Sequence, residues 1–405
     1  MQLPSPRSLA EVVADGTIEQ AAIDAASPRI KHLECNGLAP LSDEKDAACE
    51  IRLDPARRTL TATRVARISD GTWTWLTQRI EGFDLPEFRG PIPASDELID
   101  AARTLFGNAP AFVIPHDEAT ASVVIPHGRP ETLPTREALA TGLPRVPSAH
   151  LRRAIDSFAA TRGLGVRHGE EAIDFSDGTR LGLHDGLVTD IYGLGGPRFS
   201  EIRADAFFPS VEHQLLLDGR FPHHTLVCDL ASGRARLATA AGEMELKAHV
   251  MGFIEADQWR WAWADPRTGG HESAALSLRV RAFGQDKGLP VLQSPRLSWH
   301  KWLIELCKPI TGRFTHGFVH LGDSVAVVLL EHDSLRLPPP SESALRATLA
   351  RELPAGVDPQ RAVARYCDYR GLALHEGSLH APDTGRTLRI LIEGRKVSVD
   401  TDGTR

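Results

Sequence analysis

Cysteine, long apolar runs and targeting signals are scarce or absent in this sequence. The five cysteines are scattered, odd in number and never spaced as C-x-x-C, which argues against a disulfide framework and a zinc site. The longest aliphatic run, Val325 to Leu330, is far shorter than the roughly 20 residues that span a bilayer. The first residues lack the basic and apolar stretches of a secretory signal. We therefore expect a cytoplasmic protein with free thiols and no membrane partner.

A surplus of basic residues is also missing. The 405 residues include 46 Lys and Arg against 53 Asp and Glu, which gives a net charge of −7. A dedicated nucleic-acid binder needs clustered cations to neutralise phosphates, so no nucleic-acid partner is expected. Only seven of the basic residues are lysines, whereas alanine, arginine and proline are abundant. This bias is typical of a GC-rich genome and indicates a bacterial source.

The common catalytic and cofactor motifs are absent as well. The sequence has no G-x-S-x-G elbow, no H-E-x-x-H pair, no G-x-x-x-x-G-K-[ST] phosphate loop and no G-x-G-x-x-G fingerprint in a strand-to-helix setting. His316 and His320 are candidate metal ligands, but on a strand they would lie about 13 Å apart, too far to share one ion. We therefore predict no metal site, no cofactor and no catalytic residue.

What the sequence does contain is an internal repeat. Residues 64–75 match residues 250–261, and both segments have the pattern of a strand, a short turn and a second strand. Four further pairs of segments occur in the same order in both halves: 49–57 with 226–234, 95–107 with 273–284, 121–125 with 325–329, and 162–168 with 370–376. These matches predict a degenerate first repeat over residues 1–197, which includes an N-terminal helical segment, and a second repeat over residues 198–405.

The second repeat is longer than the first at one place. Gly107 and Ala121 are 14 residues apart, whereas Gly284 and Val325 are 41 apart, so about 27 residues are extra. We place this insert at about 293–322. It contains an amphipathic helical pattern with Trp299 on its apolar face, followed by an alternating strand pattern that puts His316 and His320 on one side.

A tryptophan-rich run at residues 258–266 is the most unusual local feature. On a strand, Trp259, Trp261 and Trp263 would form one aromatic stripe, with Asp265 at its end. Buried, the stripe would anchor the core of this half. Partly open, it would offer a stacking platform to a ring-bearing ligand. Both interpretations remain open at this point, with core packing favoured.

The surroundings of this run resemble a family of uncharacterised bacterial proteins built around a domain of unknown function. The resemblance rests on the pattern W-x-W-A-W-A-[N/D], here Trp259 to Asp265, on Phe283-Gly284 and on residues 288–292. It covers residues 205–335 well, and residues 45–125 only in degenerate form. The resemblance implies a related fold and no particular activity.

These patterns predict an α+β protein with two tandem copies of an antiparallel sheet, packed helices and a C-terminal helix-hairpin appendage. We predict a non-catalytic module that binds a small molecule or a protein, with any site in the second repeat. The alternative is a hydrolase-type enzyme with an aromatic pocket, in which Asp265 and His316 or His320 act as acid and base. The candidate ligand-binding residues are Trp259, Trp261, Trp263, Asp265, Trp299, His316 and His320.

Overall fold

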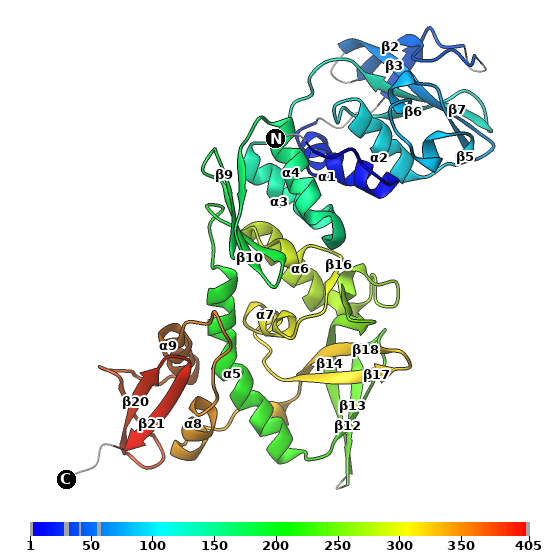
Figure 1. The fold of residues 1–405 in the computed structure, drawn as a ribbon. Helices are drawn as coiled ribbons and strands as arrows, with labels where there is room; N and C mark the ends of the chain where they lie inside the picture. The colour runs from blue at the N-terminus through cyan, green and yellow to red at the C-terminus, as the bar shows by residue number, and fades with distance from the viewer. Residues whose placement is uncertain (1–2, 28–31, 40–41, 55–57, 241, 402–405) are drawn as a thin grey trace. The chain divides into compact units, whose positions relative to one another are not determined.

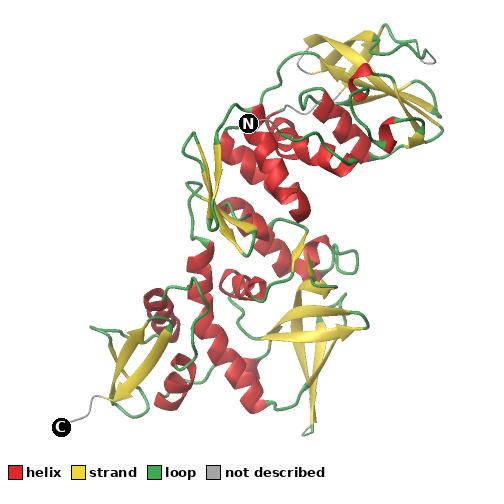
Figure 2. Ribbon diagram, in the orientation of Figure 1, coloured by secondary structure: helices red, strands yellow, loops and turns green. Residues whose placement is uncertain are grey.

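The computed structural model describes residues 3–27, 32–39, 42–54, 58–240 and 242–401. The chain divides into two compact units, Met1–Leu194 (unit 1) and Gly195–Arg405 (unit 2). Each unit combines helices with antiparallel sheets, which confirms the α+β class (Figure 1, Figure 2). Residues 55–57, the end of one matched segment, lie outside the described residues.

Unit 1 begins with a long helix, α1, whose first turn is capped by the Ser8 hydroxyl accepting from the Glu11 N–H. A seven-stranded antiparallel sheet follows, with α2 inserted before its last two strands, and a four-stranded sheet comes after α3 and α4. The elements are α1 (Leu9–Ala26), β1 (His32–Asn36), β2 (Ala48–Asp54), β3 (Arg58–Ser69), β4 (Thr72–Trp75), β5 (Ile92–Pro93), α2 (Asp96–Leu105), β6 (Phe112–Pro115), β7 (Thr120–Pro126), α3 (Thr135–Gly142), α4 (Leu151–Thr161), β8 (Val166–His168), β9 (Ala172–Phe175), β10 (Arg180–His184) and β11 (Leu187–Ile191).

Unit 2 has the same order of elements except for one extra helix and for a last sheet of three strands in place of four. Its long helix α5 packs against α7 and also against α8 and α9, and Figure 1 shows it running between the unit's two sheets. The elements are α5 (Phe199–Arg220), β12 (Thr225–Cys228), β13 (Arg234–Thr239), β14 (Gly242–Glu255), β15 (Gln258–Trp261), α6 (Ala275–Lys287), β16 (Arg296–Ser298), α7 (Trp302–Thr311), β17 (His316–Leu321), β18 (Ser324–Glu331), α8 (Glu342–Leu349), α9 (Pro359–Arg370), β19 (Ser378–His380), β20 (Thr387–Glu393) and β21 (Lys396–Thr401).

The two seven-stranded sheets have the same strand order. β1 to β5 lie side by side in sequence order and β7 pairs with β3 and β6, just as β12 to β16 lie in order and β18 pairs with β14 and β17. The β3–β7 ladder has a register irregularity between Arg64 and Ala66, and the β14–β18 ladder has one between Val250 and Gly252. These four residues are matched by the sequence repeat. The match of 49–57 with 226–234, in contrast, pairs β2 with β12, which holds the place of β1.

The connections locate the extra residues of unit 2. β4 and β5 are joined by a short segment without an α-helix, whereas residues 262–295 join β15 to β16 and form α6. From these strands to the next, the two units have the same length. Ile92 on β5 and Phe112 on β6 are 20 residues apart, and so are Leu297 on β16 and Gly317 on β17. Comparing the strands therefore pairs α2 with α7. With this pairing of helices, the extra residues of unit 2 lie before β16, whereas the sequence alignment placed them at about 293–322.

Three local expectations from the sequence are wrong. β15 ends at Trp261 and residues 262–264 form a 3-10 helix, so Trp263 leaves the predicted stripe. The helical pattern that was expected to include Trp299 begins only at Trp302, because β16 extends the sheet and the Trp299 N–H donates to the carbonyl of Asp257. In the segment matched to 95–107, α6 continues past Gly284, where the match ends, to Lys287, and the left-handed Gly288 stops it.

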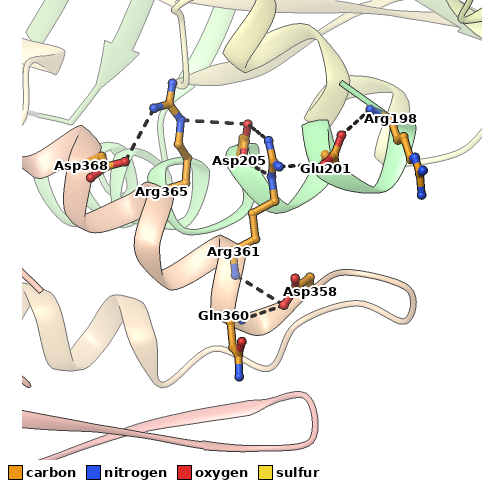
Figure 3. Close-up of polar contacts among 8 residues, drawn as sticks. All are labelled: Arg198, Glu201, Asp205, Asp358, Gln360, Arg361, Arg365 and Asp368. Atoms are coloured by element: carbon orange, nitrogen blue, oxygen red, sulfur yellow. Dashed lines mark hydrogen bonds and ion pairs between the residues drawn. The ribbon is translucent and has the colours of Figure 1, made fainter. Parts of the chain in front are cut away.

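Two arginines fasten α9 to the long helix of unit 2. The Arg361 guanidinium donates to the Asp205 carboxylate at 2.8 Å and to Glu201 at 2.9 Å, so that it is held from two turns of α5 (Figure 3). Nine residues later, Arg370 forms an ion pair with the buried Glu212 at 3.1 Å. These charged contacts hold α5 in place along one side, while its other side faces α7.

Unit 1 has the same arrangement on α4. Arg153 contacts the Asp15 carboxylate at 2.6 Å and Glu11 at 3.4 Å on α1. Arg162, again nine residues later, contacts Glu19 at 2.7 Å. The long helix of each unit is therefore fixed between a charged contact on one side and the helix of the sheet layer on the other.

Candidate functional site

A cavity of about 230 Å³ in unit 2 lies between α5 and α7, next to the first residue of β17. We call it the Lys308 cavity. Its wall is apolar where Phe207, Val211, Leu215 and Ile304 line it. Its polar and charged lining comes from Ser210, Gln214, Asp218, Lys301, Glu305, Lys308, His316 and Arg351. A small apolar cavity with a few converging polar groups is the usual form of a ligand site.

Lys308 is the most unusual member of this lining. It lies one helical turn after Ile304 on a mostly apolar helix that also carries Glu305, so the face that packs on α5 buries a cation. Only 3% of Lys308 is exposed, and within the described residues its amine has no hydrogen bond or ion pair. Burial lowers the pKa of Lys308 to about 8, although the nearby Glu305 carboxylate opposes the shift. The cavity thus holds a buried amine without a counter-ion.

Two further groups in the lining lack partners. The Gln214 amide donates weakly to the His316 carbonyl at 3.5 Å, and its Oε1 is buried without a donor. The Nδ1 atom of His316 is likewise buried without a partner. Burial, and then repulsion by Lys308 and Lys301, lower the pKa of His316 well below its usual value, so the ring is neutral. Unsatisfied buried polar atoms are costly and need an explanation.

The charges around the cavity are unequal. Glu305 is engaged by Arg203 at 3.3 Å, which neutralises it locally. Asp218 is exposed at the rim, as are Lys301 and Arg351. The lining therefore carries three cations against one carboxylate that lacks a close cationic partner among the described residues. The arrangement favours an anionic guest over a cationic one.

The corresponding place in unit 1 is filled. When α2 is aligned with α7 through the strand register, Arg103 takes the position of Lys308. Gln20 and Asp24 on α1 are four residues apart, as are Gln214 and Asp218 on α5. Arg103 binds the Asp24 carboxylate with both terminal nitrogens, at 2.6 and 3.1 Å. Its Nε donates to the Ala109 carbonyl at 3.2 Å. This cation is therefore fully paired.

Gln20 is also satisfied in unit 1. Its amide donates to the Asp100 carbonyl, the Thr104 hydroxyl and the Asn108 amide oxygen, at 3.0, 2.9 and 3.2 Å. At the positions of Thr104 and Asn108, unit 2 has Pro309 and Arg313. Proline offers no side-chain acceptor, and the guanidinium is a donor only. Neither Pro309 nor Arg313 therefore offers Gln214 a side-chain acceptor.

A second cavity of unit 2, of about 500 Å³, is lined by His213 of α5, by residues 312–315 before β17 and by residues that follow β18. Most of its charged groups pair with one another: Arg313 with Glu331 at 2.6 Å, and Arg336 with Asp333 at 2.9 Å. His213 contacts the Tyr369 hydroxyl at 2.8 Å, and burial lowers its pKa to about 4. Because these groups already satisfy each other, the Lys308 cavity is the stronger candidate.

Three of the candidate tryptophans pack in and against the sheet. Trp259 and Trp261 are fully buried, with their rings edge to face at 5.2 Å. Trp299 stacks on Trp259 at 5.5 Å, and the Trp261 indole donates to the Val291 carbonyl. Unit 1 has the same edge-to-face pair in Trp73 and Trp75. These rings have the contacts of core residues, and none of them lines either cavity.

Trp263 and Asp265 also lie away from the Lys308 cavity. The Arg281 guanidinium stacks over the Trp263 ring at 4.3 Å. The buried Asp265 accepts from the Arg267 backbone and side chain at 2.8 to 2.9 Å. Burial alone would raise the pKa of Asp265, but the hydrogen bonds and charge of Arg267 lower it overall. This carboxylate is ionised and fully engaged, unlike a proton donor.

The two candidate histidines differ. Both lie on β17 and their side chains point to the same side of the strand, but His320 is exposed and lines neither cavity. His316 alone among the seven candidate residues lines the Lys308 cavity. The structure therefore does not bring Asp265 and the histidines together.

Sequence reasoning did not single out Lys308 or Gln214. One signal was a lysine in the middle of an apolar helical run, where Ile304 and Ile310 flank it on buried positions. The other was a Gln-x-x-x-Asp pattern that occurs in both long helices. Neither could be weighed before the structure showed which partners each side chain finds.

The described residues contain neither a cluster of metal ligands nor a helix that could cross a membrane. No group of three or more His, Cys, Asp or Glu side chains that could hold a metal ion occurs among them. None of the helices they form is both long and apolar enough to cross a membrane.

Comparison with known proteins matched one segment of the chain. No curated protein and no solved structure matches this chain. Residues 200–333, which run from the start of α5 to just past β18 and supply every lining residue of the Lys308 cavity except Arg351, match a family of unknown function (DUF6882).

Proposed function

We propose that unit 2 binds a small organic carboxylate in the Lys308 cavity. The single observation that carries this proposal is the buried amine of Lys308, which has no counter-ion among the described residues. A buried charge is strongly unfavourable unless it is paired. A bound carboxylate would pair with the amine. The unfavourable free energy of the unpaired charge in the empty protein would then be relieved on binding, which strengthens the affinity.

The rest of the lining supports the same ligand class. The cations Lys301 and Arg351 at the rim attract an anion, and the apolar wall around Phe207 suits a short hydrocarbon part. The free Oε1 of Gln214 is an acceptor suited to a hydroxyl or N–H group of the ligand. The volume of about 230 Å³ is below the roughly 300 Å³ at which sites for drug-sized molecules begin, which favours a small metabolite.

The alternative of a hydrolase with Asp265 as acid has little support. Asp265 is held by Arg267 and is not part of the cavity lining, so it has no place beside His316. A protein partner is likewise less favoured, because the unpartnered polar groups lie inside a cavity and not on an open face.

We also propose that units 1 and 2 are copies of one ancestral unit, of which only the second kept a ligand site. The common strand order, the matching register irregularities and the two arginines nine residues apart support this origin. In this proposal the first copy has become structural, because Arg103 fills the place of the ligand-binding amine.

Thermal unfolding with a panel of small carboxylates tests the binding proposal. A ligand present at 100 times its Kd adds about 2.7 kcal/mol to the stability, which raises the melting temperature by several degrees. We expect this shift in the native protein and in the Lys247→Met variant, a control that removes an exposed lysine of unit 2. The shift should disappear in Lys308→Met. Equal shifts in both variants, or a response to phosphate alone, would contradict a carboxylate site at Lys308.

A further inference from the structure

We propose that Lys308 is a nucleophile that forms an imine with the carbonyl group of a small oxo-acid bound in its cavity. This inference rests on the proposed function and specifies its ligand: a carboxylate that also carries an aldehyde or ketone. It changes the role of unit 2 from passive binding to reversible covalent capture.

The geometry around the amine is that of an activated lysine. Its stem is buried between α5 and α7, and within the described residues no acceptor occupies the amine. With its pKa at about 8, about a tenth of the amine is neutral at pH 7, compared with less than a thousandth for an exposed lysine. The neutral form is the one that attacks carbonyl carbon, and burial in an apolar site is a known way of producing it.

The other cations leave Lys308 available for this step. Lys301 and Arg351 lie at the exposed rim, where they can hold the carboxylate. The carbonyl group, next to the carboxylate, would then reach inward to Lys308. His316, which is neutral and has a free ring nitrogen in the same lining, is placed to relay protons.

The chemistry balances without any further reactant. The nitrogen lone pair of the neutral amine attacks the carbonyl carbon, and the carbonyl oxygen takes up a proton to give a carbinolamine. Both amine protons finally leave with that oxygen as one molecule of water, and a carbon–nitrogen double bond replaces the carbon–oxygen one. Hydrolysis reverses each step and returns the free lysine.

Reductive trapping tests this step on the full chain. The protein is incubated with glyoxylate and sodium cyanoborohydride at pH 8, where hydride reduces an imine to a carboxymethyl-amine, and the modified lysines are located by peptide mass spectrometry. We expect the label to appear on Lys308 faster than on the six other lysines. We expect no label at this position in Lys308→Arg, which keeps the charge and whose fold is checked by circular dichroism, and normal labelling of Lys308 in Lys247→Met.

Propionate, which has a carboxylate but no reactive carbonyl, separates this inference from the proposed function. If propionate stabilises the protein and glyoxylate labels only other lysines, the imine is excluded while carboxylate binding stands. If neither compound stabilises the protein and Lys308 stays unlabelled, both proposals fail. Excess propionate that slows labelling of Lys308, and of no other lysine, would support both.

Discussion

The two units place related residues at the same point of their folds and use them differently. In unit 1, Arg103 forms two bonds to Asp24, and the Gln20 amide nitrogen lies within hydrogen-bond distance of three acceptors. In unit 2, Lys308 takes the position of Arg103 in the strand register and has no ion pair among the described residues, and the Gln214 Oε1 is buried without a donor. The contrast teaches that the partners available to a buried cation decide whether it forms a closed network or is left unpaired.

The chemistry of the two cations explains the difference. Arginine presents a planar fork that matches a carboxylate, and Arg103 uses it on Asp24 with two bonds. A lysine has one compact charged group, and Lys308 forms no ion pair with Asp218 among the described residues. The contact of Arg103 with Asp24 therefore stabilises unit 1, whereas the unpaired Lys308 is an energetic cost in unit 2.

The largest expected effect comes from Arg103→Met in unit 1. The substitution removes both bonds to Asp24 and the bond to the Ala109 carbonyl, and we expect it to lower the free energy of unfolding by about 3 kcal/mol. Urea unfolding followed by circular dichroism measures the loss. The exposed Arg52→Met is the matched control and should change stability by less than about 0.5 kcal/mol. Equal small effects for both variants would remove the contrast between the units.

Lys308→Met should act in the opposite direction. The lysine has a pKa of about 8 in the folded protein and about 10.5 when unfolded, so its charge destabilises the empty protein at neutral pH. We expect the variant to be more stable by about 2 kcal/mol at pH 7. Below pH 8 both states of the native protein are protonated, so this difference is constant.

The pH dependence of that difference follows from linkage. Between pH 8 and 10.5 the unfolded native protein binds more protons than the folded one, so its stability rises with pH and approaches that of the variant. Urea unfolding of both proteins at pH 7 and pH 10 measures the change. A variant that is less stable than the native protein at pH 7 would show that Lys308 is paired.

The smallest contrast concerns the two glutamines. Gln20→Leu breaks three hydrogen bonds in unit 1 and should lower stability by about 1 to 2 kcal/mol. Gln214→Leu removes a buried, unpaired oxygen and should leave stability unchanged or raise it by up to about 1 kcal/mol. Differential scanning calorimetry of the two variants compares them directly. A larger loss for Gln214→Leu than for Gln20→Leu would contradict the account.

Much of the fold could be predicted from local patterns. The α+β class followed from alternating strands and capped helices, and the hairpin at Asp70-Gly71 and the strand at His316 are where the turn residues and the alternation put them. The pairing of Arg64 and Val250 in the alignment agrees with the register irregularity that both sheets share. Short-range periodicity is enough for these features.

What failed depends on contacts between distant segments. The alignment paired α2 with α6 because both follow a tryptophan strand, but only the edge strands β5 and β16 reveal that α7 is the equivalent helix. The tryptophans drew attention by size, although large rings usually fill cores. Lys308 was not predicted as a site residue, because what distinguishes it is burial without a counter-ion, and no sequence pattern shows which partners a side chain has in the fold.

Nuclear magnetic resonance of the protein labelled with carbon-13 at the lysine side chains tests the central claim most directly. With only seven lysines in the chain, each resonance can be followed through a pH titration. The account predicts one resonance that titrates near pH 8, is missing in Lys308→Met and moves when a small carboxylate is added. Seven resonances that all titrate near the ordinary value of about 10.4, with none moved by the ligand, would contradict it.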